Sequence, residues 1–80
     1  MPVVFRYKGF RFFFFSNEGN PRAPLHVHVR SGGSEAKFWL EPQARVATSY
    51  GFDAATLREL AAVAQTNSEQ ITKAWHEYFG

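Results

Sequence analysis

Two stretches of alternating apolar and polar residues, 25–30 and 35–40, restrict the fold of this chain more than any other feature. Successive side chains of a β-strand point to opposite faces, so each stretch predicts a strand with one apolar and one polar face. The Gly32-Gly33 pair between them predicts a tight turn, and therefore a hairpin. Its apolar face would carry Leu25, Val27, Val29, Ala36, Phe38 and Leu40, and its polar face His26, His28, Arg30, Glu35, Lys37 and Trp39.

Three further strands are predicted beside this hairpin. Residues 3–7 are β-branched and aromatic, and Lys8-Gly9 provides a turn into a second strand over residues 10–15. Residues 16–24 are dense in turn formers and predict a loop, and a short edge strand is predicted over residues 45–48. The second strand would place Phe10, Phe12 and Phe14 on one face, and Arg11, Phe13 and Phe15 on the other.

Two helices are predicted in the last part of the chain. Asp53 is a favourable N-cap for a helix over residues 54–65. Asn67 and Gln70 have the spacing of a capping box at the start of a second helix. The apolar residues of this second helix recur at helical spacing and predict a buried stripe of Ile71, Ala74, Trp75, Tyr78 and Phe79.

Strands followed by helices predict an α+β fold. We expect a two-layer sandwich in which a small antiparallel sheet of three to five strands is covered on one face by two C-terminal helices. The chain would form a single domain over residues 1–80, with the sheet in residues 1–49 and the helices in residues 50–80. Two helices cover only one face of a sheet, so the polar face of the hairpin would stay open and display His26, His28 and Trp39.

Composition narrows the class of protein. The chain has 80 residues, 45% of them apolar, and no cysteine, which excludes disulfides and Cys-ligated metal sites. Its net charge of +2 is not concentrated in a basic tail. Charged residues interrupt the apolar N-terminal region, so neither a signal peptide nor a membrane span is predicted. We therefore expect a cytoplasmic protein that has no membrane association and no cofactor.

Motifs distributed over the chain carry a family resemblance. They are Phe-Ser-Asn-Glu-Gly at 15–19, Pro-Leu-His-Val-His-Val at 24–29, Ala-Lys-Phe-Trp-Leu-Glu-Pro at 36–42, Gly51-Phe52, and Ala-Trp-His-Glu-Tyr-Phe-Gly at 74–80. Together they resemble a bacterial family of domains of unknown function, number 4160, over essentially the whole chain. The resemblance implies a small protein, often encoded beside another small domain, in a pairing suspected to be a toxin–antitoxin-like module. It implies no established activity.

His26 and His28 lie two residues apart and would share one strand face, about 7 Å apart along the backbone. Three interpretations stay open: a polar face without a chemical role, a general acid–base pair for phosphodiester cleavage, or a two-histidine metal grip. In the second, Glu18 would orient an imidazole, and Arg30 or Lys37 would stabilise the phosphorane. In the third, only Glu18 or Glu35 is available as a further ligand, and we assign no metal ligands.

Aromatic and basic residues would join the histidines on the open face if residues 10–15 keep the predicted phase. These residues are Arg11, Phe13, Phe15, Arg30, Lys37 and Trp39. Cations between aromatic rings suit single-stranded RNA, because they neutralise phosphates and offer surfaces on which bases stack. The alternative is that a dimer partner or the N-terminal segment covers Phe13 and Phe15. A slip of one residue in register would remove Arg11 from this face.

The sequence therefore predicts a small interaction module that uses its open sheet face. Its partner would be a cognate small protein, a second copy of the chain, RNA or DNA, and the resemblance places it in a toxin–antitoxin-like pair. Two alternatives are a metal-independent endoribonuclease that uses His26 and His28, and a histidine-based metal-binding domain.

Overall fold

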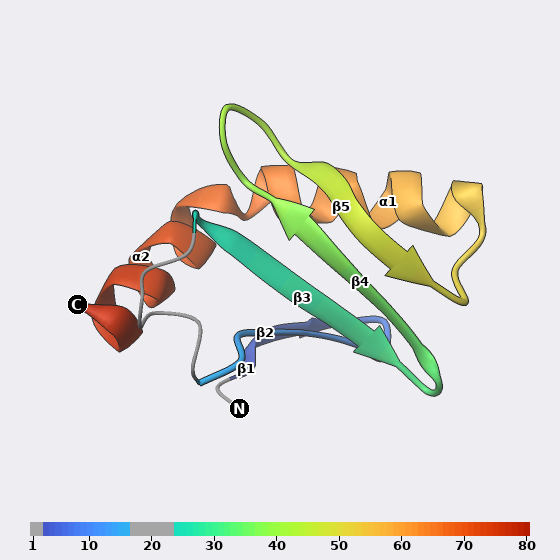
Figure 1. The fold of residues 1–80 in the computed structure, drawn as a ribbon, viewed down its shortest axis with the longest axis horizontal. Coiled ribbons are helices and arrows are strands. Elements are labelled where there is room, and N and C mark those ends of the chain that lie inside the picture. Colours follow the sequence, from blue (N-terminus) through green and yellow to red (C-terminus); the bar gives the residue numbers. More distant parts are fainter. Residues whose placement is uncertain (1–2, 17–23) are drawn as a thin grey trace.

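The chain forms a five-stranded antiparallel sheet followed by two helices, in a computed structural model that describes residues 3–16 and 24–80. Each strand lies beside its neighbours in the sequence, so the sheet order is β1-β2-β3-β4-β5 (Figure 1). The predicted α+β two-layer fold is confirmed. The elements are β1 (Val3–Tyr7), β2 (Phe10–Phe13), β3 (His26–Ser31), β4 (Ser34–Trp39), β5 (Arg45–Tyr50), α1 (Ala54–Thr66) and α2 (Ser68–Phe79).

The predicted hairpin is present, in the predicted register. Strands β3 and β4 pair His26 with Trp39 at one end and Ser31 with Ser34 at the other, around Gly32-Gly33. Gly32 has a φ of 58°, a left-handed backbone that glycine adopts without a steric penalty. The turn chemistry therefore agrees with the alternation of the two strands, and both specify the same register.

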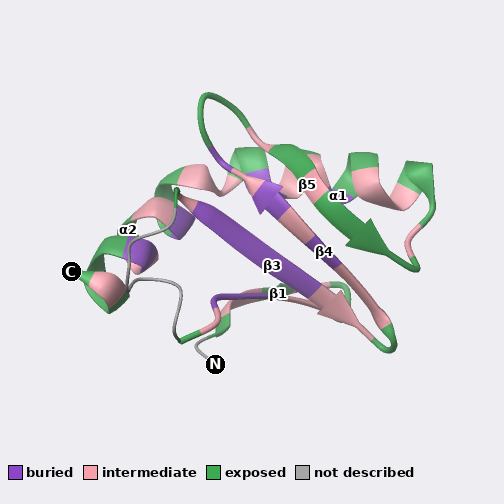
Figure 2. Cartoon of the chain, viewed as in Figure 1, coloured by how far each residue is buried: buried purple, intermediate pink, exposed green. Residues whose placement is uncertain are grey.

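Both helices pack on the apolar face of the sheet. Leu60 and Ala64 of α1, with Ile71 and Trp75 of α2, belong to one buried cluster with the apolar side chains of the strands. The strands contribute Phe12, Phe14, Val27, Val29, Ala36, Phe38 and Leu40. Figure 2 shows burial along most of β3 and in the helix turns that face the sheet. The helices therefore cover the apolar face of the sheet, as predicted.

A carboxylate ties α1 to the turn between β1 and β2. The Tyr7 hydroxyl donates to Glu59 Oε2 at 2.6 Å, and Lys8 Nζ lies 3.4 Å from the same oxygen. These contacts, of which the Tyr7 hydrogen bond has the largest effect, hold the pKa of Glu59 below its ordinary value.

Asp53 caps α1 as predicted, because its carboxylate accepts from the Thr56 backbone N–H at 2.7 Å. This hydrogen bonding with Thr56 lowers the pKa of Asp53.

Four local predictions need correction. Strand β2 ends at Phe13 rather than at residue 15, and β5 continues to Tyr50 rather than ending at residue 48. Tyr78 is 46% exposed, although its spacing had predicted a place in the core. Asn67 is the N-cap residue of α2, as predicted, but it forms no capping box, because its side-chain amide donates backward to the Val63 carbonyl of α1 at 2.8 Å.

Neither helix in the described part of the chain is suited to cross a bilayer. They contain 13 and 12 residues, whereas a span needs about 20 apolar residues.

Candidate nucleic-acid interface

The open face is the side of the sheet turned away from the helices. Residues paired directly across antiparallel strands share a face, so the register determines which side chains meet there. Arg11 pairs with Arg30, and Phe13 with His28. The predicted phase of residues 10–13 is therefore confirmed. The side chains of Arg11 and Phe13 lie on the same face as the polar side of the hairpin.

Three arginines on neighbouring strands form a row across this face. Arg6 of β1 pairs with Arg11 of β2, which pairs with Arg30 of β3. Arg6 is exposed and the other two are partly exposed. Arg6 was not predicted as a site residue, although it and Arg11 are placed symmetrically about the predicted Lys8-Gly9 turn.

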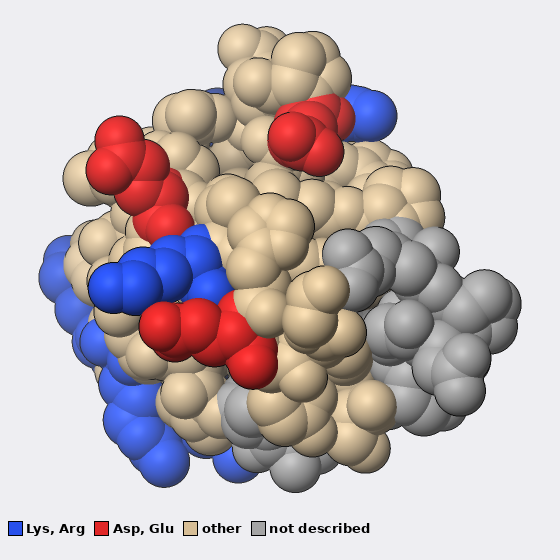
Figure 3. All heavy atoms as spheres, turned by 90° about the vertical axis from the view of Figure 1, so that its left-hand side faces the viewer, with Lys and Arg blue, Asp and Glu red and all other residues tan. Residues whose placement is uncertain are grey.

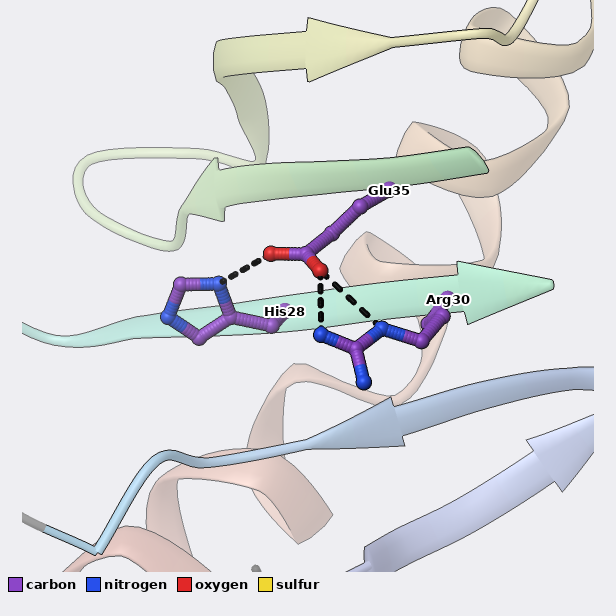
Figure 4. A network of polar contacts seen from close by, with 3 residues as sticks. All are labelled: His28, Arg30 and Glu35. Atoms are coloured by element: carbon purple, nitrogen blue, oxygen red, sulfur yellow. Dashed lines mark hydrogen bonds and ion pairs between the residues drawn. The ribbon is translucent and has the colours of Figure 1, made fainter. Parts of the chain in front are cut away.

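Glu35 of β4 extends this row and neutralises part of it. Arg30 Nε and Nη2 donate to Glu35 Oε1 at 3.0 and 2.6 Å. The other carboxylate oxygen, Oε2, lies 3.9 Å from His28 Nδ1. Figure 4 shows the carboxylate lying between the guanidinium and the imidazole, on one side of β3 and β4. The pair could have been read from the sequence, since Arg30 and Glu35 are placed symmetrically about the glycine turn.

The predicted display of the histidines is wrong. His26 is 0% exposed and His28 is 6% exposed, although both lie on the open face as predicted. They pack into a group of rings, here called the ring cluster, that consists of Phe13, Phe15, His26, His28 and Trp39. The His28 ring lies 4.5 Å from that of Phe15 and stacks on that of Phe13 at 5.6 Å. Phe13 itself is only 1% exposed, so it offers no stacking surface.

His26 has a structural environment. Its ring lies 5.2 Å from that of Trp75 in α2, and 5.8 Å from that of Trp39. His26 Nδ1 lies 2.7 Å from the Pro24 carbonyl oxygen. Because a carbonyl only accepts, the imidazole carries its proton on Nδ1 in this contact. The ring links the start of β3 to α2, and a substrate does not reach it in this arrangement.

The metal interpretation finds no cluster of ligands in the described residues. Within residues 3–16 and 24–80, no three side chains of His, Cys, Asp or Glu are grouped so that they would hold a metal ion. Glu18, predicted to orient an imidazole or to ligate a metal, lies outside the described residues.

The accessible part of the open face lies along β4 and β5. Lys37 Nζ lies 4.4 Å from the centre of the Trp39 ring, and Tyr50 is 75% exposed. Two hollows lie here. One of about 410 Å³ is lined by His28, Gly33, Glu35, Ala36, Thr48, Ser49 and Tyr50. One of about 300 Å³ is lined by Pro24, Leu25, Trp39, Glu41 and Arg45. Arg45 was not predicted as a site residue, although it pairs with Trp39.

Charge is divided between the two layers. Residues 3–16 and 24–50 contain six Lys and Arg against two Glu, whereas residues 51–80 contain two Lys and Arg against four Asp and Glu. Figure 3, which views the end of the molecule that carries the α2 terminus, shows Lys and Arg side chains gathered along one edge. The net charge of the chain is small because the charges of a basic sheet and an acidic helical layer nearly cancel.

The fold and this face define a small α+β domain with a basic, partly aromatic sheet surface. A family model, described as a domain of unknown function (DUF4160), matches residues 9–76. The chain belongs to this family, and the predicted membership is confirmed. No curated protein and no solved structure matches the chain significantly.

Proposed function

We propose that this protein binds single-stranded nucleic acid, RNA or DNA, through the open face of its sheet. The observation that carries the proposal is the arginine row, in which Arg6, Arg11 and Arg30 are neighbours on three adjacent strands. Like charges directly opposite each other on a sheet are destabilising. Among the described residues Glu35 contacts the Arg30 end of the row, and phosphates would relieve repulsion along the rest of it.

The arrangement of the other side chains favours single strands. Trp39 and Tyr50 lie on the same face as the cations, where Trp39 is partly exposed and Tyr50 is exposed. Single-stranded nucleic acid is bound without strong sequence preference by a basic groove together with aromatic rings on which bases stack. An open sheet face with rings and cations has this chemistry.

A protein partner is less well supported by this face. The core of a protein interface is depleted in charged residues and enriched in aromatic ones. The exposed large apolar and aromatic side chains of the described residues, Val3, Val46, Tyr50 and Tyr78, are scattered over β1, β5 and α2. A surface of clustered cations with dispersed apolar groups matches a polyanion better than a folded protein.

The test is binding of fluorescently labelled single-stranded RNA and DNA, followed by anisotropy over a range of salt concentrations. We expect affinity to fall steeply with salt, with a log–log slope of about −2 to −3 for three or four phosphate contacts. Arg11→Ala should weaken binding and make the slope shallower by about one unit. Arg58→Ala, the same change on an exposed position of α1, is the control. Equal effects of the two substitutions, or no salt-dependent binding, would refute the proposal.

One observation favours a protein partner as a second candidate. Strand β5 pairs only with β4, and all of its residues except Ala47 are exposed. A free edge strand can accept a strand from another chain. The toxin–antitoxin-like pairing implied by the family resemblance would supply such a chain.

Co-expression with the protein encoded beside this one, with and without Val46→Lys in β5, tests this second candidate. A complex that is lost in the variant supports the pairing. A complex that survives the substitution would exclude β5 as the docking strand, and sedimentation would separate a homodimer from a mixed complex.

The ribonuclease alternative loses one of its two imidazoles in this structure. His26 is 0% exposed, whereas His28 lines the larger hollow and lies 3.9 Å from Glu35. Cleavage would therefore need to proceed with His28 alone. We expect binding without cleavage, and RNA cleavage that His28→Ala abolishes would contradict this.

A further inference from the structure

The smaller hollow of the open face has the composition of a site for one ring system. Its volume is about 300 Å³, at the lower end of the range for small-molecule sites, about 300–1,000 Å³. It is lined by an indole, a guanidinium, a carboxylate and two apolar side chains, those of Trp39, Arg45, Glu41, Pro24 and Leu25.

The indole of Trp39 is held in place from inside the protein. Its ring meets that of His26 at 5.8 Å, nearly perpendicular, and His26 is itself fixed by the Pro24 carbonyl. A ring packed in this way presents a fixed surface to a ligand. Such preorganisation reduces the entropy lost on binding.

A cation already occupies one side of this indole. Lys37 Nζ lies 4.4 Å from the ring centre, at the end of a long and partly exposed side chain. A base arriving with its phosphate offers the ammonium a charged partner and offers the ring a planar one. Lys37 is not part of the lining of the hollow, so its ammonium can bind a phosphate beside the indole while the base enters the hollow.

We propose that this hollow holds one unpaired nucleobase, stacked on Trp39, while Lys37 and Arg45 bind the flanking phosphates. The inference rests on the proposed binding of single strands, and it assigns this hollow as the site that binds and distinguishes one base. Glu41 sets the preference. A carboxylate accepts from the exocyclic amino group of cytosine, whereas uracil presents a carbonyl oxygen there. Cytosine is therefore favoured over uracil.

Tryptophan fluorescence gives a direct test, because the chain contains only two tryptophans and Trp75 is 2% exposed. Oligocytidine should quench the emission of the wild-type protein more strongly than oligouridine of equal length. Trp39→Ala should weaken binding of oligocytidine about tenfold, the loss of one stacked base. Glu41→Gln should reduce the preference for cytosine without removing binding.

Two exposed tyrosines serve as controls. Tyr78→Ala, on α2, should leave affinity unchanged, and Tyr50→Ala, on the open face but outside this hollow, should have a smaller effect than Trp39→Ala. If Trp39→Ala fails to fold, as judged by circular dichroism, Trp39→Leu keeps an apolar side chain without an aromatic face and takes its place.

The outcomes separate this inference from the proposed function. Salt-dependent binding without a change in Trp39 emission, or an equal loss in the Trp39 and Tyr50 variants, would overturn the base site and leave sheet-face binding standing. Failure of the wild-type protein to bind any oligonucleotide would overturn both.

Discussion

The two faces of the sheet arise from the same alternating strands, yet they bury their side chains in different ways. On the covered face, Val27, Phe38 and Leu60 are fully buried, and the helices close the layer. On the open face, the rings of Phe13 and His26 are equally well buried, Phe13 among neighbouring rings and His26 also against Trp75 of α2.

Long basic side chains lie over the open-face rings. The Arg30 guanidinium lies 5.3 Å from the centre of the Phe13 ring, and the Lys37 ammonium lies 4.4 Å from that of Trp39. Such side chains cover apolar surface with their stems and keep their charge at the surface, where a cation above a ring is also favourable. A sheet face can therefore bury its rings and still present cations to a ligand.

The largest expected effect separates two neighbours in β4 that point to opposite faces. Phe38→Ala removes a fully buried ring from the covered face and should cost about 3–5 kcal/mol, a large part of the stability of a small domain. Lys37→Ala should change stability by less than about 0.5 kcal/mol and weaken oligonucleotide binding instead. Urea unfolding and anisotropy measure the two quantities. Comparable losses of stability would show that the open face is as much a core as the covered one.

A second prediction concerns the connection that brings the helices onto the covered face. Gly51 follows β5 with a φ of 86°, and a Cβ there would come within 2.9 Å of Ser34 Cβ and 3.2 Å of its Cα. Gly51→Ala should therefore cost about 1–3 kcal/mol. At Gly33 a Cβ would meet nothing within 4 Å, so Gly33→Ala is the control. Equal thermal unfolding of both variants would mean that the connection tolerates a different path.

Much of the sheet could be predicted because alternation and turn chemistry specify the same register. The directions of the side chains in β3 and β4 follow from one glycine pair and a period of two. The depth of burial does not follow from this pattern. His28 is covered by Phe15, which lies beyond the end of β2, so only the folded chain shows that its imidazole is buried.

The two missed residues, Arg6 and Arg45, differ in how far the sequence could have placed them. Arg6 pairs with Arg11 symmetrically about the Lys8-Gly9 turn, so its place on the open face follows from that turn. Arg45 lies beyond a shift in the pairing of β4 with β5, between Lys37 and Phe38, and no sequence pattern marks this shift. The pairing of Arg11 with Arg30 joins strands that no tight turn connects, so it depends on the folded chain.

A third prediction sharpens the electrostatic side of the comparison. Glu35→Gln keeps the shape of the side chain but removes the negative charge that Arg30 contacts at 2.6 Å. Oligonucleotide affinity should rise a few-fold, while stability falls by about 1 kcal/mol or less, because both side chains are partly exposed. Glu77→Gln, an exposed position on α2, removes the same charge from the other layer. If the two substitutions strengthen binding equally, net charge rather than the arginine row governs affinity.

The smallest expected effect is a loss of folding stability at acid pH, caused by two carboxylates of the helical layer. Asp53 and Glu59 have pKa values below their ordinary values of 3.8 and 4.5, because of hydrogen bonding with Thr56 and Tyr7 respectively. The unfolded chain therefore takes up protons first as the pH falls, and the stability contributed by these carboxylates is present at neutral pH and lost through the range below about 4.5.

Asp53→Asn with Glu59→Gln keeps hydrogen-bond acceptors at both positions but cannot titrate. Urea midpoints of this double variant should depend less on pH than those of the wild type, whereas Glu77→Gln should follow the wild type. An unchanged pH dependence in the double variant would contradict this assignment of the acid sensitivity.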